Sequence, residues 1–159
     1  MQPKAWIFGD DVNTDVIFPG KYTYTVSDPV EMAKHALEDL DPSFAETVRR
    51  GDIIVAGKNF GCGSSREQAA FALKYAGVSA IIAKSFARIF FRNAINAGLP
   101  AIEHPDCASA IRSDSSVAID LARSVILVDG SEFAFAPFPE QVMAILSEGG
   151  LTEYVRMTL

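Results

Sequence analysis

Three short apolar runs, separated by segments of helical pattern, are the feature that most constrains how this chain folds. Ile53–Ala56 and Ala80–Ala83 are apolar and contain β-branched residues, so both are predicted to be buried strands. A third strand is expected at 101–102, and helices are predicted over about 65–76 and 85–97. A strand, helix, strand, helix, strand order implies parallel pairing of the three strands.

The flanking segments give weaker patterns that fit the same α/β class. A strand is expected at 5–8, followed by a polar turn and a second strand-like run at 16–18. Ser85 is expected to cap the second central helix. Other elements are expected as helices near 29–37, 42–49, 139–147 and after Gly150, and as antiparallel strands at 124–128 and 132–135. The sequence thus predicts one mixed α/β domain over 1–159.

The composition fits a globular domain whose partners are small molecules or proteins. A chain of 159 residues with 49% hydrophobic content is long enough to bury a core. The net charge of −6 argues against a nucleic-acid partner, because phosphate binding needs a basic face. Cys62 and Cys107 are far apart, and neither His35 nor His104 lies at metal-ligand spacing from them. We therefore expect this chain alone to bind no metal ion and no iron–sulfur cluster.

No segment has the pattern of a secretory signal or a membrane anchor. The first residues include Pro3 and Lys4 and contain no apolar core of the secretory kind. No apolar stretch approaches the roughly 20 residues needed to cross a bilayer. The chain is expected to be cytoplasmic, or organellar if a transit segment was removed, and to make no membrane contact.

The segment from Gly57 to Glu67 carries the most informative pattern, because it joins a buried strand to the start of a helix. It has three glycines in its first seven residues. Glycine lets a backbone approach a ligand closely, and a helix start offers free N–H groups and a partial positive charge. Arg66 adds a forked donor suited to a carboxylate. The loop therefore predicts an anion cradle that also holds the hydroxyls of Ser64 and Ser65.

Other interpretations account for less of this loop. Ser64 and Glu67 have the spacing of a capping box, in which the serine only caps the helix. A capping box explains neither the glycine density nor Arg66 in the first turn, where the helix dipole disfavours a cation. The loop lacks the lysine of a Walker A motif and the third glycine of a dinucleotide-binding motif. Cys62 has no adjacent base, so a shielded thiol is a better interpretation than a nucleophile.

At these residues the chain resembles the swivel domain of the aconitase superfamily. The match extends in order over segments 9–17, 59–67, 83–90 and 93–100, and segment 59–67 reads Asn-Phe-Gly-Cys-Gly-Ser-Ser-Arg-Glu. Within the superfamily the chain is similar to the free-standing small subunits of three hydro-lyases: 3-isopropylmalate dehydratase, homoaconitase and 2,3-dimethylmalate dehydratase. The resemblance implies a swivelling β/β/α domain with a mixed sheet and flanking helices.

The resemblance also implies that two chains divide the chemistry. A large subunit would hold a [4Fe–4S] cluster as the Lewis acid for a malate-type hydroxy diacid. Ser64 would be the base that removes a carbon-bound proton, and Ser65 and Arg66 would bind the substrate carboxylate. Gln68 stands where the family usually has histidine, so no proton transfer is expected at that position. Further residues are expected at the edge of the active site: Thr14, Asp15 and Gly63.

The segment after Pro19 matches the loop with which this family reads its substrate. Relatives that act on homologues of citrate place arginine there, and this chain has no arginine between Gly20 and Ser43. The uncharged Thr23, Tyr24 and Val26 suit an alkyl substituent, and Lys21 is the exception in this loop. We therefore expect 3-isopropylmalate, in leucine biosynthesis, with dimethylmalate and homoaconitate as alternatives. The residues expected to contact substrate from this loop are Lys21, Thr23 and Tyr24.

Two other questions stay open at the level of sequence. A domain of this kind that had lost its large partner would bind ligands without catalysing a reaction, although the intact Ser64-Ser65-Arg66 favours an enzyme. Arg88, Arg92 and Asn96 form a polar stripe on the second central helix. The stripe is interpreted as a solvated face, with a contact to the large subunit as the alternative.

Overall fold

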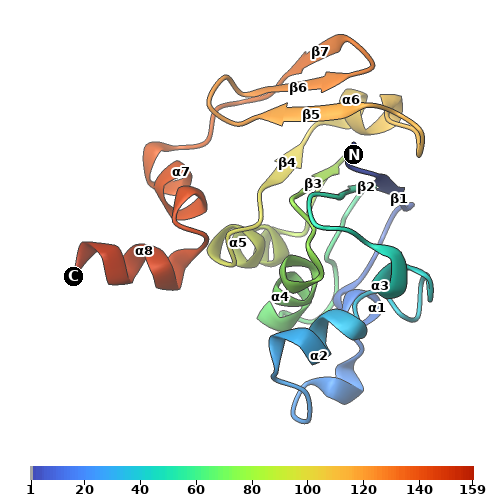
Figure 1. Cartoon of the computed structure of the whole chain (residues 1–159), viewed down its shortest axis with the longest axis vertical. Coiled ribbons are helices and arrows are strands. Elements are labelled where there is room, and N and C mark those ends of the chain that lie inside the picture. Colours follow the sequence, from blue (N-terminus) through green and yellow to red (C-terminus); the bar gives the residue numbers. More distant parts are fainter. Residues whose placement is uncertain (1) are drawn as a thin grey trace.

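A four-stranded parallel sheet lies at the centre of the computed structural model, which describes residues 2–159 (Figure 1). Met1, part of the expected 1–159 domain, lies outside the described residues. The strands follow one another in chain order, and in the register Ile54 faces Ile81, which faces Ala101. The predicted parallel pairing is therefore confirmed. The strands are β1 (Ala5–Ile7), β2 (Ile53–Ala56), β3 (Ala80–Ala83) and β4 (Ala101–Glu103).

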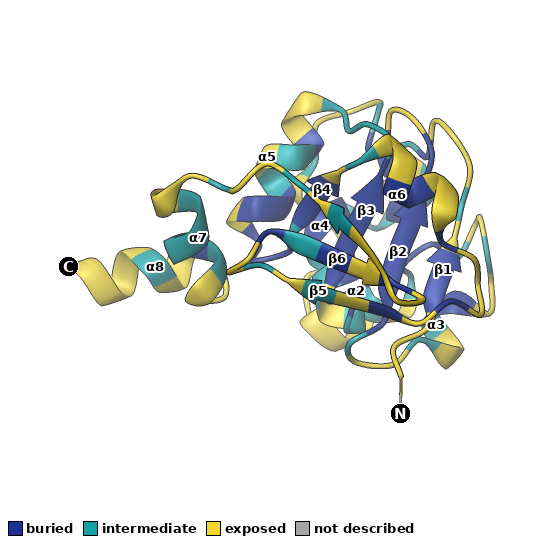
Figure 2. Ribbon diagram, turned by 90° about the horizontal axis from the view of Figure 1, so that it is seen from above, coloured by how far each residue is buried: buried dark blue, intermediate teal, exposed yellow. Residues whose placement is uncertain are grey.

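The two faces of this sheet are covered differently, and side chains alternate between them. Ile54 and Ile81 pack in the cluster that includes the helices α2 (Pro29–Lys34), α4 (Glu67–Ala76) and α5 (Arg88–Asn96). Ile53 and Ile82 pack in a second cluster on the other face. That face is covered by α6 (Pro105–Ala110) and an antiparallel sheet of β5 (Val117–Asp120), β6 (Val125–Val128) and β7 (Ser131–Ala134) (Figures 1 and 2).

Buried on both faces, the central strands need the continuous apolar runs seen in the sequence. The layers correspond to the expected β/β/α arrangement, in which a mixed set of parallel and antiparallel strands is flanked by helices. The chain ends in α7 (Glu140–Ser147) and α8 (Leu151–Thr158), which lie beside α5 and extend away from the sheets (Figure 1). No helix within residues 2–159 is long and apolar enough to cross a membrane.

Two local predictions are wrong. The run at 16–18 is not a strand, because residues Thr14–Ile17 form the single helical turn α1, whose first N–H groups are capped by Asn13. The Asn13 Oδ1 accepts a hydrogen bond from the Val16 N–H at 2.9 Å. Ser85 does not cap α5, which begins three residues later at Arg88. The Ser85 hydroxyl oxygen instead accepts a hydrogen bond from the Asn59 N–H at 2.8 Å. The remaining short elements are η1 (Gly20–Tyr22) and α3 (Phe44–Thr47).

A buried carboxylate fastens the segment before β1 to the start of β2. Asp52, which is 3% exposed, accepts hydrogen bonds from the Lys4 N–H at 2.9 Å, the Trp6 indole N–H at 3.1 Å and the Arg49 N–H at 2.9 Å. Burial acts to raise the pKa of Asp52, but the three donated hydrogen bonds outweigh it, so that the pKa lies below its ordinary value. Asp52 therefore stays ionised in the folded chain near neutral pH.

Candidate active site

The loop between β2 and α4 runs over the carboxyl edge of the parallel sheet, where open α/β sheets bind ligands. It is pinned on both sides by backbone hydrogen bonds. The Gly61 N–H donates to the Val12 carbonyl at 2.7 Å, and the Thr14 N–H donates to the Cys62 carbonyl at 2.9 Å. On the other side, the Phe60 N–H donates to the Ser85 carbonyl at 3.1 Å. The loop is thus held between two segments that are distant in sequence.

Gly61 allows this loop to lie directly against α5. Its φ of +84° is in the left-handed region, and a Cβ added there would lie 2.1 Å from Cγ of Phe90. Phe90 is 2% exposed and packs edge-on against Phe60, with ring centroids 5.2 Å apart. Any side chain at this position would push the loop away from the helix.

The capping box is not formed. Helix α4 begins at Glu67, its N-cap is Arg66, and no side chain caps its first N–H groups. Ser64 is exposed and, within residues 2–159, its hydroxyl makes no hydrogen bond. Arg66 accordingly precedes the first turn and does not lie in it. The interpretation of Ser64 as a structural cap is wrong, and its hydroxyl is left available for another role.

A small cavity of about 180 Å³ opens at Ser64, between the loop and the start of α5. The backbone N–H groups of Gly63, Ser64 and Ser65 make no hydrogen bonds within residues 2–159. Three successive free N–H groups before a helix start form the kind of site in which an anion is stabilised. The cavity is lined by Thr14, Gly61, Gly63, Ser64, Ser65, Arg66, Ala87, Arg88, Ile89, Phe90 and Asn93.

Thr14 holds the main chain at Ser64 in place by a hydrogen bond. Its side chain is 2% exposed, and its hydroxyl donates a hydrogen bond to the Ser64 carbonyl at 2.7 Å. A buried hydroxyl on one residue thus fixes the direction of the peptide that carries the exposed hydroxyl of another. Thr14 also lines the cavity, and its place at the edge of an active site stays a prediction.

Arg66 spends most of its donors on the protein itself. Its Nη1 donates to Thr23 Oγ1 at 2.9 Å, and its Nη2 lies 2.9 Å from the Thr14 carbonyl and 2.6 Å from the Phe18 carbonyl. The same Nη2 forms an ion pair with Asp15 Oδ1 at 3.1 Å. The Arg66 Nε is buried and has no partner within residues 2–159. Arg66 therefore ties α4 to α1 and to the segment that follows Pro19.

The three residues expected to contact substrate from the loop after Pro19 are placed differently from one another. Thr23 is half-buried and reaches the site through its hydrogen bond with Arg66. Tyr24 is 97% exposed, and neither Tyr24 nor Lys21 lines the cavity at Ser64. The Lys21 ammonium lies 5.2 Å from the ring centroid of Tyr22. Thr23 does not line the cavity either, but it is the one of the three that hydrogen-bonds to a residue lining it.

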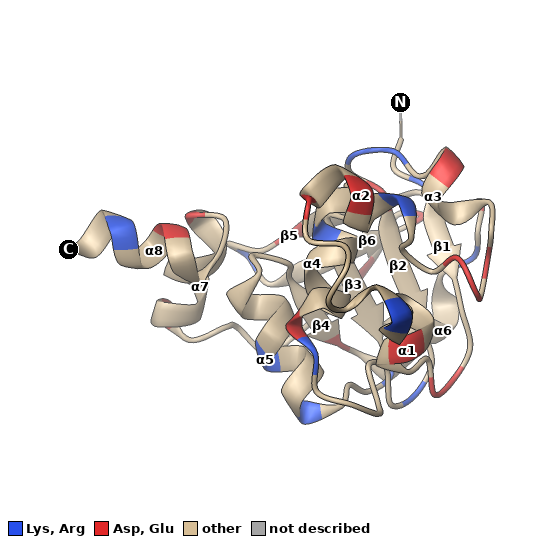
Figure 3. Ribbon diagram, turned by 90° about the horizontal axis from the view of Figure 1, so that it is seen from below, with Lys and Arg blue, Asp and Glu red and all other residues tan. Residues whose placement is uncertain are grey.

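Of the residues that α5 contributes to the cavity, the sequence singled out only Arg88, as part of a polar stripe. Ile89, Phe90 and Asn93 line it because, in a sheet of consecutive parallel strands, successive helices start at the same edge. Arg88 also lines the cavity, and both Arg88 and Arg92 are exposed; Figure 3 shows basic residues on α5. That α5 would start beside α4 was therefore readable from the βαβαβ order, although which side chains would point inward was not.

Within residues 2–159, no group of three or more His, Cys, Asp and Glu is placed to hold a metal ion. Both cysteines are free: Cys62 is half-buried in the loop, and Cys107 is fully buried on α6. Burial raises the pKa of the Cys107 thiol to about 11, so it is neutral at physiological pH. The donor set of the site at Ser64 is thus made of hydroxyls, N–H groups and a guanidinium, which suit an anionic organic ligand.

The layered α/β fold and the glycine-rich loop with two serines at the edge of its sheet are the features to compare with known families. Residues 13–106, more than half of the chain, match the aconitase C-terminal domain, and the chain belongs to that family. It is 54% identical to the 3-isopropylmalate dehydratase small subunit of Caldicellulosiruptor bescii, covering 96% of this chain and 93% of that protein. The small subunit of the same name from Aquifex aeolicus is 52% identical, with 98% of this chain and 94% of that protein covered.

A solved structure supports the same relationship. The crystal structure of 3-isopropylmalate dehydratase from Methanocaldococcus jannaschii superposes with a TM-score of 0.90 at 45% sequence identity. The superposition covers 99% of this chain and 93% of that one. The arrangement of both sheets and of the helices is therefore shared nearly from end to end.

Proposed function

We propose that this chain is the small subunit of a 3-isopropylmalate dehydratase, a hydro-lyase that removes water from a malate-type hydroxy diacid and adds it back at the neighbouring carbon. The proposal is supported by about one-half sequence identity to small subunits of that name over nearly their whole length. The structural observation that carries it is the Ser64 hydroxyl, which is exposed, does not cap α4 and lies beside three N–H groups without a partner within residues 2–159. We propose further that the reaction belongs to leucine biosynthesis, as the relatives' name implies, and that it takes place in the cytoplasm.

In this proposal Ser64 is the base. A serine hydroxyl is too weak an acid to serve as an alkoxide unless its anion is stabilised, because its pKa in water lies far above neutrality. The N–H groups of Gly63 and Ser65 have no partner within residues 2–159 and flank Ser64 just before the positive end of α4, so we propose that they stabilise negative charge on its oxygen. The alkoxide takes the proton from the substrate carbon, and the resulting hydroxyl returns a proton during rehydration.

The neighbouring residues would orient the substrate. We propose that the Ser65 hydroxyl donates to a substrate carboxylate and that the nearby positive charge of Arg66 attracts it; the Nε of Arg66 is buried, so the guanidinium acts through its charge. Because Nη2 of Arg66 is already bound by Phe18 and Asp15, the guanidinium is fixed in orientation before substrate arrives. Thr14 and Gly63 act by holding the loop, and Asp15 by holding Arg66.

The large subunit is the partner that completes the site. A cavity of about 180 Å³ is smaller than the usual small-molecule pocket of about 300–1,000 Å³, so a second surface is needed to enclose the substrate. We propose that this surface carries a [4Fe–4S] cluster, which supplies a Lewis acid for the departing hydroxyl. One swivel domain over 1–159 thus contributes the base, and its partner contributes the metal.

The alkyl group of the substrate is proposed to face the segment that contains Lys21, Thr23 and Tyr24. This segment has no arginine to pair with the extra carboxylate of a homoaconitate-type substrate. Thr23 reaches Arg66, so the segment is physically linked to the carboxylate end of the site. Dimethylmalate is smaller and fits the same chemistry, which makes it the second substrate to test.

The test compares Ser64→Ala with a matched control in the complex reconstituted with the cluster-bearing subunit. Ser113 is exposed and has no hydrogen bond within residues 2–159, so Ser113→Ala is the control. Ser64 does not cap α4, so Ser64→Ala is expected to change the free energy of unfolding by less than about 0.5 kcal/mol. Turnover of 3-isopropylmalate should be lost in Ser64→Ala and retained in Ser113→Ala.

The same assay separates the alternatives. The isolated chain is expected to be colourless and inactive, and dehydratase activity from it alone would refute a division between two subunits. Side-by-side rates with isopropylmalate, dimethylmalate and homoaconitate identify the substrate. A chain that forms no complex with any cluster-bearing subunit would be a binding domain without catalysis. Retained turnover in Ser64→Ala would remove that residue from the role of base.

A further inference from the structure

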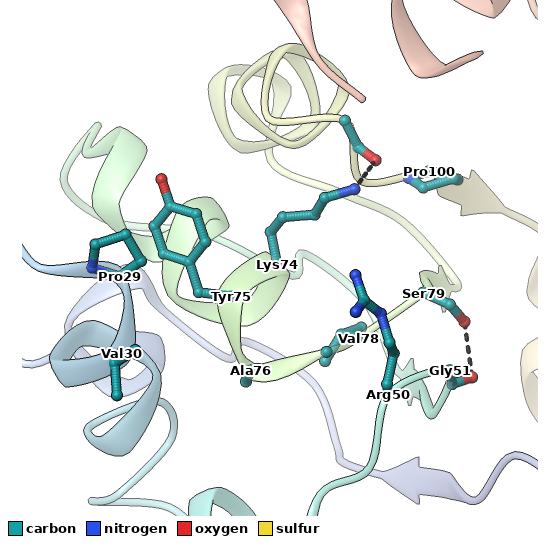
Figure 4. A pocket seen from close by; sticks show the side chains of 12 residues that line it. Pro29, Val30, Arg50, Gly51, Lys74, Tyr75, Ala76, Val78, Ser79 and Pro100 are labelled. Carbon is teal, nitrogen blue, oxygen red and sulfur yellow. Dashed lines mark hydrogen bonds between the residues drawn. The ribbon is translucent and has the colours of Figure 1, made fainter. Parts of the chain in front are cut away.

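A second cavity, of about 670 Å³, opens at the C-terminal end of α4, the end away from Ser64 (Figure 4). It shares no residue with the cavity at Ser64. Its size falls in the range of small-molecule sites. It is lined by Pro29, Val30, Arg50, Gly51, Lys74, Tyr75, Ala76, Gly77, Val78, Ser79, Gly98 and Pro100.

Two cations and no carboxylate line this cavity. Arg50 and Lys74 are its charged residues, in a chain that has 20 acidic and 14 basic side chains overall. Burial lowers the pKa of Lys74, and the positive charge of Arg50 lowers it further. Figure 4 shows the Arg50 guanidinium directed toward the Lys74 side chain. The two positive charges therefore face each other without an acidic residue between them.

Of the two cations, only Lys74 has a structural role that explains its position. It lies in the last turn of α4, where a cation is favoured by the helix dipole, and its ammonium donates to the Gly98 carbonyl at 2.9 Å. That bond uses one of its three N–H groups. The explanation does not extend to Arg50, whose side chain makes no hydrogen bond or ion pair within residues 2–159.

The backbone brings Arg50 to this position by a close approach. Gly77 has a φ of +105°, and a Cβ added there would lie 3.0 Å from Cα of Arg50. Gly77, at the C-terminal end of α4, thus lets the segment before β2 pack against the end of the helix. As a result, the Arg50 guanidinium, which has no partner within residues 2–159, acts electrostatically on the half-buried Lys74 ammonium.

Apart from Ser79, whose hydroxyl donates to the Gly51 carbonyl at 2.8 Å, the other side chains of the wall are mainly apolar. Val30 on α2 is 65% exposed and Tyr75 on α4 is 42% exposed, although both are large hydrophobic side chains. Pro29, Val78 and Pro100 extend the same surface. An occupant that contacts this wall would remove apolar area from water, at about 25 cal/mol for each Å².

We propose that this cavity binds a small organic acid, with its carboxylate between Arg50 and Lys74 and its apolar body against Tyr75 and Val30. A guanidinium and an ammonium together match a carboxylate in charge and in donor geometry. The ligand class is therefore a monocarboxylate that carries a short alkyl or aromatic group. Binding at this site requires neither the large subunit nor the reaction proposed for Ser64.

The test is an NMR titration of the ¹⁵N-labelled full chain at constant ionic strength. The probes are 4-methylpentanoate, the uncharged 4-methylpentan-1-ol, acetate and inorganic phosphate. Saturable shifts are expected with 4-methylpentanoate at the amides of Gly51, Gly77, Ser79 and Gly98. Acetate lacks the alkyl body and phosphate lacks any apolar part, so both should bind about tenfold more weakly or worse. The alcohol, which has no charge, should give no saturable shift.

Variants assign the binding to the cations. Arg50→Gln should weaken 4-methylpentanoate about tenfold, because a charge-assisted hydrogen bond is lost. Arg112 is exposed and does not line the cavity, so Arg112→Gln is the matched control. Its affinity for 4-methylpentanoate should equal that of the parent chain. Equal affinity in Arg50→Gln, equal binding of phosphate or the alcohol, or no saturation with 4-methylpentanoate would each overturn the proposal.

Discussion

Replacing Thr14 with valine tests whether a buried hydrogen bond positions the serine that we propose as the base. Valine has nearly the same shape as threonine but cannot donate to the Ser64 carbonyl, which lies 2.7 Å from the Thr14 hydroxyl. Losing this bond at a residue that is 2% exposed should cost about 1–2 kcal/mol of unfolding free energy. For a chain of 159 residues, that lowers Tm by roughly 2–4 °C for each kcal/mol.

A matched variant separates stability from positioning. Thr14→Ser keeps the hydroxyl and loses one buried methyl group, which also costs about 1 kcal/mol. The two variants should therefore be destabilised to a similar extent, as measured by urea unfolding of the isolated chain. In the reconstituted complex, however, only Thr14→Val should lose turnover, by about tenfold or more, because small displacements of a reacting group are costly.

The comparison of kcat decides the question. If Thr14→Val and Thr14→Ser turn over at the same rate, the hydrogen bond to the Ser64 carbonyl does not position the hydroxyl. A rise in KM without a change in kcat would likewise contradict the argument, since the loop would then act on ground-state binding. Because the unfolding energies are matched, a difference in kcat cannot be attributed to partial unfolding.

Three further outcomes are expected. Gly61→Ala should destabilise the chain by about 3 kcal/mol or more in urea unfolding, because its Cβ would overlap the ring of Phe90 and its φ is positive. Asp52 has a lowered pKa, so the stability it contributes is fully present above the unfolded pKa of about 3.9 and is lost as pH falls through the folded pKa. Asp52→Asn should therefore lower the free energy of unfolding at pH 7 by about 2 kcal/mol or more and make that free energy depend less on pH in the acid range. The fluorescence of the single tryptophan would report the unfolding. Cys107, with a pKa of about 11 and full burial, should stay unmodified by a thiol reagent at pH 7.5 while the half-buried Cys62 reacts, as mass spectrometry of the peptides would show.

The central sheet could be predicted because its strands are buried on both faces. Such strands need apolar residues at every position, and Ile53–Ala56 and Ala80–Ala83 show this directly. By contrast, β5 alternates between buried and exposed residues over only four positions, and α6 has His104 as its N-cap. The His104 Nδ1 accepts a hydrogen bond from the Cys107 N–H at 3.0 Å, a cap outside the usual Ser, Thr, Asp and Asn. Neither element was predicted.

The site was predicted in composition but not in its contacts. A glycine-rich loop before a helix indicates an anion site from local sequence alone, and Ser64, Ser65, Arg66, Thr14 and Gly63 do line one cavity. The partners of Arg66 lie 43 to 52 residues away in sequence and depend on how α1 packs against α4. The local pattern therefore predicted that Arg66 binds a carboxylate of the substrate. In the folded chain, both Nη atoms of Arg66 already bond to other residues of the protein.

An open hydroxyl and a row of free N–H groups at a protein edge cost little while water can solvate them. The same groups become strong only when water is excluded, because hydrogen bonds and charges act more strongly at low dielectric. The Ser64 site has its donors arranged, with Arg66 and Thr14 fixing the backbone, but its cavity of about 180 Å³ remains open on one side. Docking of the large subunit would therefore do more than bring a metal to the substrate. By removing water from Ser64, it would also supply the electrostatic environment that a serine needs to become a base, and the isolated chain would be inactive for both reasons.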